Sequence, residues 1–207
     1  MSGFEFFFTF YGLVMGLAVA ELLGGLSRTI HARVRMGLLP LLLAVFVVVD
    51  AASFWNQAWT IFRHAPFNYA MLILGLVISG ALYVAATLVF PREPAEGPSL
   101  EEHFWRHRRT ALLCLLTANL IVGLVFISVA GSTGDLARMG LGLRFWVGFG
   151  LFTVATVVAA LAPGRRVVTA ALVVLLLYSG YQVGRSALQI FESGGWPMGG
   201  RAAAEAG

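Results

Sequence analysis

Six apolar stretches, each near the length that a helix needs to cross a lipid bilayer, constrain what this chain can fold into. They cover about residues 4–26, 38–62, 67–90, 108–130, 143–162 and 167–191. A crossing helix needs about 20 apolar residues, and only helices or closed barrels satisfy the backbone inside lipid. The sequence therefore predicts an all-α integral membrane protein, a six-transmembrane-helix bundle. Residues 1–192 are expected to form a single transmembrane domain, and 193–207 a flexible C-terminal tail.

The composition agrees with a membrane protein and excludes several classes of function. The chain has 207 residues, of which 59% are hydrophobic and 12% charged, and its mean hydropathy is +0.85. A soluble domain has about 25% charged residues. All 14 basic residues are arginines, so a Schiff-base lysine and a retinal pigment are excluded. The arginines are scattered through the loops instead of forming the clustered basic patch that a nucleic-acid partner requires.

The distribution of arginines predicts the orientation in the membrane. Cytoplasmic loops carry an excess of basic residues. The first, third and fifth loops hold nine arginines, namely Arg28, Arg33, Arg35, Arg92, Arg106, Arg108, Arg109, Arg165 and Arg166, against Arg63, Arg138, Arg144 and Arg201 on the other side. The first residues lack the basic region of a secretory signal, so we expect the first span to be retained. These patterns predict a multi-pass protein of a bacterial inner membrane with both termini in the periplasm.

Polar residues at helical spacing occur inside two of the six stretches. In the second stretch, Asp50, Ser53, Gln57 and Thr60 share one helix face, with Asn56 beside it; in the sixth, Tyr178, Gln182, Arg185 and Gln189 do so. A polar group without a partner in lipid is costly, so such residues normally face protein or a wet cavity. The two stripes lie at matching depth. We therefore predict that these nine residues line a polar cavity between the second and sixth helices.

Two interpretations of the stripes remain open. In one, Asp50 and Arg185 form a buried ion pair that fixes the register of the helices. In the other, they line an outward-open vestibule for an ion or small solute. Arg185 is expected to reach Asp50 or the amides of Asn56 and Gln57. Two aromatic residues on the far side of the second helix, Trp55 and Trp59, are expected to face apolar neighbours or the outer interface.

Small residues at regular spacing predict close helix packing. The first stretch carries Gly12, Gly16, Ala20 and Gly24, and the sixth carries Gly180 and Gly184 on the side opposite its polar stripe. Small residues every fourth position allow two membrane helices to approach closely. We expect these positions to contact other helices and the sixth helix, with one close-packing side and one polar side, to lie centrally in the bundle. We also expect a homo-oligomer or a complex with other membrane subunits.

A weak sequence similarity relates the first three spans of the chain to the last three. Leu72, Leu76, Ser79, Gly80 and Leu88 recur as Leu172, Leu176, Ser179, Gly180 and Leu188. A duplication of three spans would give inverted repeats, which are common in transporters. The alternative is that common residues of apolar helices match by chance, without any duplication.

Several isolated polar residues favour structural roles. Glu21 is expected to pair with Arg28, and Tyr83 and Asn119 to form interhelical hydrogen bonds. His103 and His107 are spaced for one metal ion, but no third ligand lies nearby, so we expect a solvated or headgroup-contacting pair and no metal or cofactor. Ser99 and Glu102 form a potential capping box after a proline-rich loop, and a short interfacial helical turn should begin there.

The sequence thus predicts a membrane channel or transporter for an ion, a proton or a small solute. Asp50 would be the ion-handling carboxylate and Arg185 its partner. The alternative is a non-enzymatic accessory or scaffold subunit of a larger membrane complex. A lipid-modifying enzyme with Asp50 or Glu21 as base is disfavoured, because the sequence contains no evident nucleophile–base pair or metal cluster.

Overall fold

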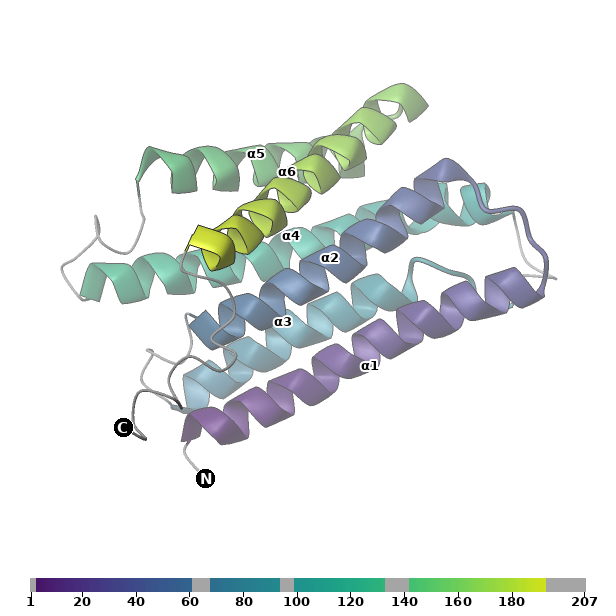
Figure 1. Ribbon diagram of the computed structural model, residues 1–207. Coiled ribbons are helices and arrows are strands. Elements are labelled where there is room, and N and C mark those ends of the chain that lie inside the picture. Colours follow the sequence, from purple (N-terminus) through teal and green to yellow (C-terminus); the bar gives the residue numbers. More distant parts are fainter. Residues whose placement is uncertain (1–2, 61–67, 94–98, 133–141, 193–207) are drawn as a thin grey trace, which may run out of the picture.

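The computed structural model of the chain is an all-α membrane protein (Figure 1). The structure describes residues 3–60, 68–93, 99–132 and 142–192, and within them no strand occurs. The six helices are α1 (Gly3–His31), α2 (Leu38–Thr60), α3 (Tyr69–Thr87), α4 (Leu100–Ser132), α5 (Leu143–Leu161) and α6 (Arg165–Glu192). Each is long and apolar enough to cross a membrane, which confirms the predicted fold class. The predicted tail at 193–207, and Arg63, Arg138 and Arg201, lie outside the described residues.

Two helices are longer than predicted, both at the arginine-rich end of the bundle. Helix α1 continues past residue 26 to His31, and α4 begins at Leu100 instead of following a separate interfacial turn. The Ser99 hydroxyl caps α4 by accepting a hydrogen bond from the backbone N–H of Glu102 at 3.2 Å. The reciprocal half of the predicted capping box is not used, because the Glu102 carboxylate accepts from Arg106 at 3.0 Å.

Helix α2 is the central element of the bundle. It contacts α1, α3, α4 and α6, while α1 packs mainly on α3, and α5 packs on α4 and α6. Helices α2 and α6 run in the same direction, and the first residues of α1 and the last of α6 lie at the same end (Figure 1). The predicted adjacency of the second and sixth helices is therefore present.

Aromatic rings set into glycine positions hold neighbouring helices close together. The Phe7 ring of α1 lies so near Gly75 of α3 that an added Cβ would overlap it, and the Tyr178 hydroxyl of α6 lies equally near Gly148 of α5. Cores of this kind are close-packed, so even one extra methyl group would disturb the packing. These contacts join α1 to α3 and α5 to α6, the helix pairs with extensive mutual packing.

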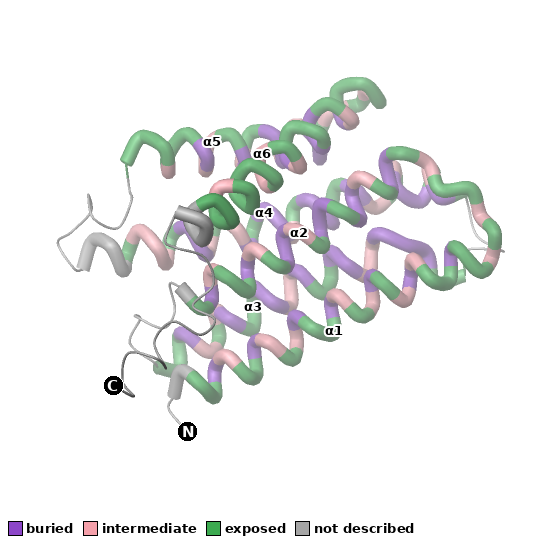
Figure 2. The backbone as a smooth tube through the Cα atoms, in the orientation of Figure 1, coloured by how far each residue is buried: buried purple, intermediate pink, exposed green. Residues whose placement is uncertain are grey.

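The predicted small-residue positions are only partly used within one copy of the chain. Gly12 lies against the Trp55 ring of α2, with an added Cβ 3.4 Å from that ring. Gly24 meets only Arg28 of its own helix, Ala20 is exposed, and Gly16, Gly180 and Gly184 face open space. Exposed positions dominate the second half of α6 (Figure 2), and α6 is the least buried of the six described spans, so the expectation that the sixth helix lies centrally was wrong. A packing role for these glycines therefore remains a prediction about contacts with another chain.

Candidate functional site

The Asp50 carboxylate lies in the interior of the bundle, on α2. It is 5% exposed, and its partner is the side-chain amide of Asn119 on α4. Asn119 Nδ2 lies 3.1 Å from Asp50 Oδ2 and 3.4 Å from Oδ1. The same nitrogen donates to the backbone carbonyl of Leu115, one turn earlier, at 3.0 Å. The expectation that Asn119 forms an interhelical hydrogen bond is confirmed, and its partner is the carboxylate predicted to be functional.

The neighbours of Asp50 along its own helix are mostly apolar. Phe46, Val47 and Phe54, one turn away on either side, are all buried. Ser53 is half-buried, and its hydroxyl donates to the Val49 carbonyl at 3.0 Å. The Tyr11 hydroxyl of α1 lies within electrostatic reach of the carboxylate. The site is therefore a single acidic group enclosed by three helices.

The expected ion pair between Asp50 and Arg185 is absent. No arginine or histidine of the described chain forms an ion pair with Asp50. On α6, Arg185 is half-buried and Gln182 is exposed, while Tyr178 packs on α5. Although α2 and α6 touch, their polar stripes do not meet at Asp50, because α4 supplies the residue that faces the carboxylate.

The remaining residues of the α2 stripe lie towards the end of the helix. Gln57 is half-buried and Asn56 is exposed. The side chains of Thr60 on α2 and Gln189 on α6 lie outside the described part of the structure. The seven described residues of the predicted cavity are thus not joined into one described hollow, since Asp50 faces α4, Tyr178 packs on α5 and Asn56 lines a groove between α1 and α2.

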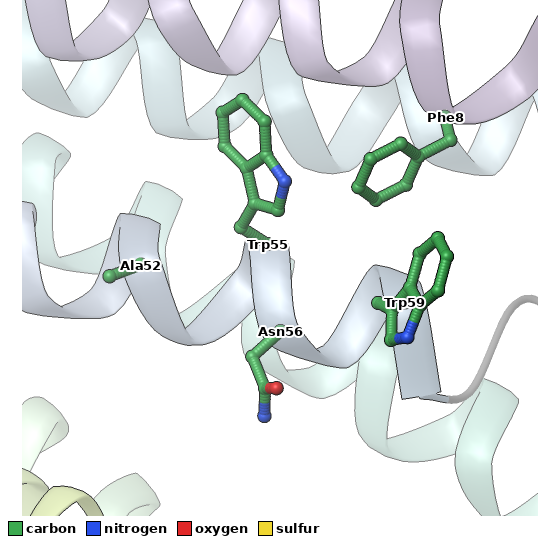
Figure 3. A pocket seen from close by; sticks show the side chains of 5 residues that line it. All are labelled: Phe8, Ala52, Trp55, Asn56 and Trp59. Atoms are coloured by element: carbon green, nitrogen blue, oxygen red, sulfur yellow. The ribbon is translucent and has the colours of Figure 1, made fainter. Parts of the chain in front are cut away.

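A shallow open groove of about 550 Å³ lies between α1 and α2, lined by Phe8, Ala52, Trp55, Asn56 and Trp59 (Figure 3). The Phe8 ring meets Trp55 and Trp59 edge to face, with ring centroids 6.0 Å and 5.5 Å apart. The expectation that both tryptophans face apolar neighbours is confirmed. A second hollow, between α1, α2 and α3, is apolar and has no room for a water molecule. Neither hollow is lined by Asp50.

The first turns of α4 form a second polar cluster, which was not predicted from the sequence. Arg108 is 3% exposed and donates to two carbonyl oxygens at the end of α5, Ala159 at 2.8 Å and Ala162 at 2.6 Å. Its guanidinium carbon also lies 4.3 Å from the centre of the Trp105 ring. The last carbonyls of a helix lack intrahelical donors and carry partial negative charge, so a buried arginine satisfies both requirements.

Two further contacts tie the same part of α4 to other helices. His103 Nε2 donates to the Leu88 carbonyl at the end of α3, at 3.1 Å, and Glu101 forms a 2.9 Å ion pair with Arg165 at the start of α6. His103 is buried, so the expectation of a solvated histidine pair was wrong for this residue. The predicted pairing of Glu21 with Arg28 is confirmed at 2.9 Å.

Metal chemistry has no centre in the part of the chain that the structure describes. No three histidine, cysteine, aspartate or glutamate residues converge there. The chain matches no protein-family model, no curated protein and no solved structure. The geometry around Asp50 is therefore the feature from which a function can be inferred.

Proposed function

We propose that this protein is a membrane transport protein, a channel or transporter, in which Asp50 and Asn119 form the site for an ion, a proton or a small polar solute. The observation that carries the proposal is a buried carboxylate whose hydrogen-bond partner is a neutral amide. Ionisable groups inside a membrane are costly and are generally retained for function. A structural ion pair would supply a reason to keep Asp50 without transport, but the arginine expected for that role lies elsewhere.

The route that we propose begins at the end of the bundle where α2 and α6 terminate. Gln57 on α2 and Gln182 on α6 would supply polar groups there, and Ser53 would lead from Gln57 towards Asp50 along one helix face. Because Asp50 is buried and lines neither described hollow, we propose that transport requires a movement of the helices around it. Such gating motions are the usual way for transporters to expose a central site.

Flux through liposomes containing the purified full-length chain tests this proposal. We expect proton or ion flux with the wild type and its loss in Asp50→Asn. The matched control is Ser79→Ala, which removes a buried hydroxyl that bonds the Gly75 carbonyl of its own helix at 2.8 Å and should leave flux unchanged. A wild type that passes no ion, or an Asp50→Asn variant with unchanged flux, would contradict the proposal.

A second candidate function is a non-enzymatic subunit of a larger membrane assembly. It is supported by the outer half of α6, where Gln182, Gly180 and Gly184 are exposed at a depth at which lipid offers no hydrogen bonds. Mass spectrometry after gentle detergent extraction separates the two candidates. A different chain in fixed stoichiometry would favour the subunit, whereas a complex of this chain alone would favour a homo-oligomeric transporter.

We also propose in which membrane the protein lies and how it is oriented there. The described arginines of the first, third and fifth loops lie at the end of the bundle opposite the start of α1, which supports a cytoplasmic position for that end. Both termini would then be periplasmic, in a bacterial inner membrane. Single cysteines introduced at Arg35 and at Ser2, labelled from outside intact cells, distinguish the two orientations: only position 2 should react.

A further inference from the structure

We propose that the species handled at Asp50 is a proton and not a metal cation. This inference rests on the proposed transport function and specifies its substrate. Protonation forms an O–H bond on one carboxylate oxygen and neutralises the side chain, and release on the other side of the membrane breaks that bond. The proposal follows from which atoms face the carboxylate.

The amide of Asn119 presents nitrogen, not oxygen, to Asp50. Its two N–H hydrogens are both used, one towards Asp50 and one towards the Leu115 carbonyl at 3.0 Å. Turning the amide over would place its oxygen against the Leu115 oxygen, so that two acceptors would face each other. The bond to Leu115 therefore fixes the orientation, and a cation beside Asp50 would meet an N–H group.

Within the described residues, the side-chain contact of Asp50 supplies nitrogen where a metal cation would need oxygen. Ions such as Mg²⁺ and Ca²⁺ take roughly six to eight oxygen ligands. The side chain that contacts Asp50 offers an N–H group and no oxygen to such an ion, and the Ser53 hydroxyl on the same helix face already donates to a backbone carbonyl. A proton needs only one oxygen atom and no shell of ligands.

In the described part of the chain, Asp50 has no fixed counter-charge. Helix α3 carries no acidic or basic side chain. The charged residues of α4 lie between Glu101 and Arg109, at least about 15 Å along the helix from Asn119. Among the described residues, Asp50 forms no ion pair with Arg185 or any other basic side chain, and its side-chain partner is the neutral amide of Asn119. A buried carboxylate in such surroundings becomes stable when a proton neutralises it.

Infrared difference spectroscopy of the full-length protein tests proton binding directly. Between alkaline and acidic pH, we expect the carbonyl band of a protonated carboxylic acid to appear in the wild type, to remain in Ser79→Ala and to be lost in Asp50→Asn. In the wild type alone, adding Na⁺, K⁺ or Mg²⁺ at constant ionic strength should leave the band unchanged. A band that is absent, that never changes with pH or that is removed by one of these ions would overturn the inference.

Liposome flux separates failure of this inference from failure of the proposed function. Proton flux driven by a pH gradient, without Na⁺ or K⁺ flux, supports both. Flux of Na⁺ or K⁺ without proton flux would leave the transport function standing and overturn the proton assignment. If the infrared band behaves as expected but no ion crosses, proton binding stands and the transport function fails.

Discussion

Arg108 of α4 donates a 2.6 Å hydrogen bond to the carbonyl oxygen of Ala162, just beyond the last residue of α5. Together with its bond to Ala159, this contact makes a buried arginine the cap of a neighbouring helix. Removing the guanidinium leaves two carbonyls without their donor. We expect Arg108→Gln to lower the free energy of unfolding by about 2–4 kcal/mol, measured by denaturant titration in detergent. Arg109→Gln, at the exposed neighbouring position, is the control; equal effects of the two changes would contradict the capping role.

The pairing of Asp50 with Asn119 predicts non-additive effects on stability. Asn119→Leu leaves a buried carboxylate without its amide donor and should cost about 1–3 kcal/mol. Replacing both residues by leucine removes donor and acceptor together, so the double variant should be more stable than Asn119→Leu alone. Thermal unfolding of the single and double variants provides the measurement. Strictly additive losses would show that the two side chains do not interact.

The contact between Phe7 and Gly75 predicts a large difference between two chemically identical substitutions. Gly75→Ala places a methyl group against the ring and should destabilise the protein by about 1–3 kcal/mol. Gly16→Ala, at a helical position with open space beyond, should be neutral or stabilising by up to about 1 kcal/mol, because alanine favours helix. Unfolding midpoints of both variants, compared in the same detergent, test the contact. Similar midpoints would mean that α1 and α3 do not approach as closely as described.

The ion pair between Glu101 and Arg165 is expected to contribute little, although it joins two helices. Both side chains are substantially exposed, at 36% and 59%, and exposed pairs are typically worth below about 1 kcal/mol. Glu101→Gln should therefore lower the unfolding temperature only slightly, and the difference should shrink further at high salt. A large effect that is independent of salt would show that the pair is buried in the membrane-embedded protein.

The proposed route predicts which positions react with aqueous reagents. Single cysteines replacing Ser53, Gln57 and Gln182, in a background with Cys114→Ala, should be labelled by water-soluble thiol reagents in liposomes. A cysteine at Val154, an exposed apolar position of α5, should face lipid and remain unlabelled. Labelling at the lipid-facing control but not at the three route positions would refute a hydrated seam between α2 and α6.

Much of the fold follows from the sequence because a bilayer permits few solutions. A long apolar run must become a helix in lipid, so all six helices were predicted with errors only at their ends. Local pairs such as Glu21 with Arg28 were also predictable, since residues seven apart lie two turns apart on one helix face.

Partners on different helices were less predictable. Asp50 lies on a face of α2 that α6 and α4 approach from different sides, and helical spacing alone does not decide between Arg185 and Asn119. The sequence does not indicate that Arg108 is buried, because an arginine among several others at a helix end is typical of a solvated loop. Only the position of α5 reveals its role.

The placement of Arg108, His103 and Glu101 within the first turns of α4 has a mechanical consequence. These three residues join α3, α5 and α6 to α4 at the arginine-rich end, whereas towards the opposite end α6 is joined to α5 by an exposed hydrogen bond from Arg144 to the Tyr181 hydroxyl. Separating the helices at the arginine-rich end would break several hydrogen bonds at once. The least costly distortion of this molecule is therefore a pivot about that end, which spreads the helix tips where α1 begins and α6 ends.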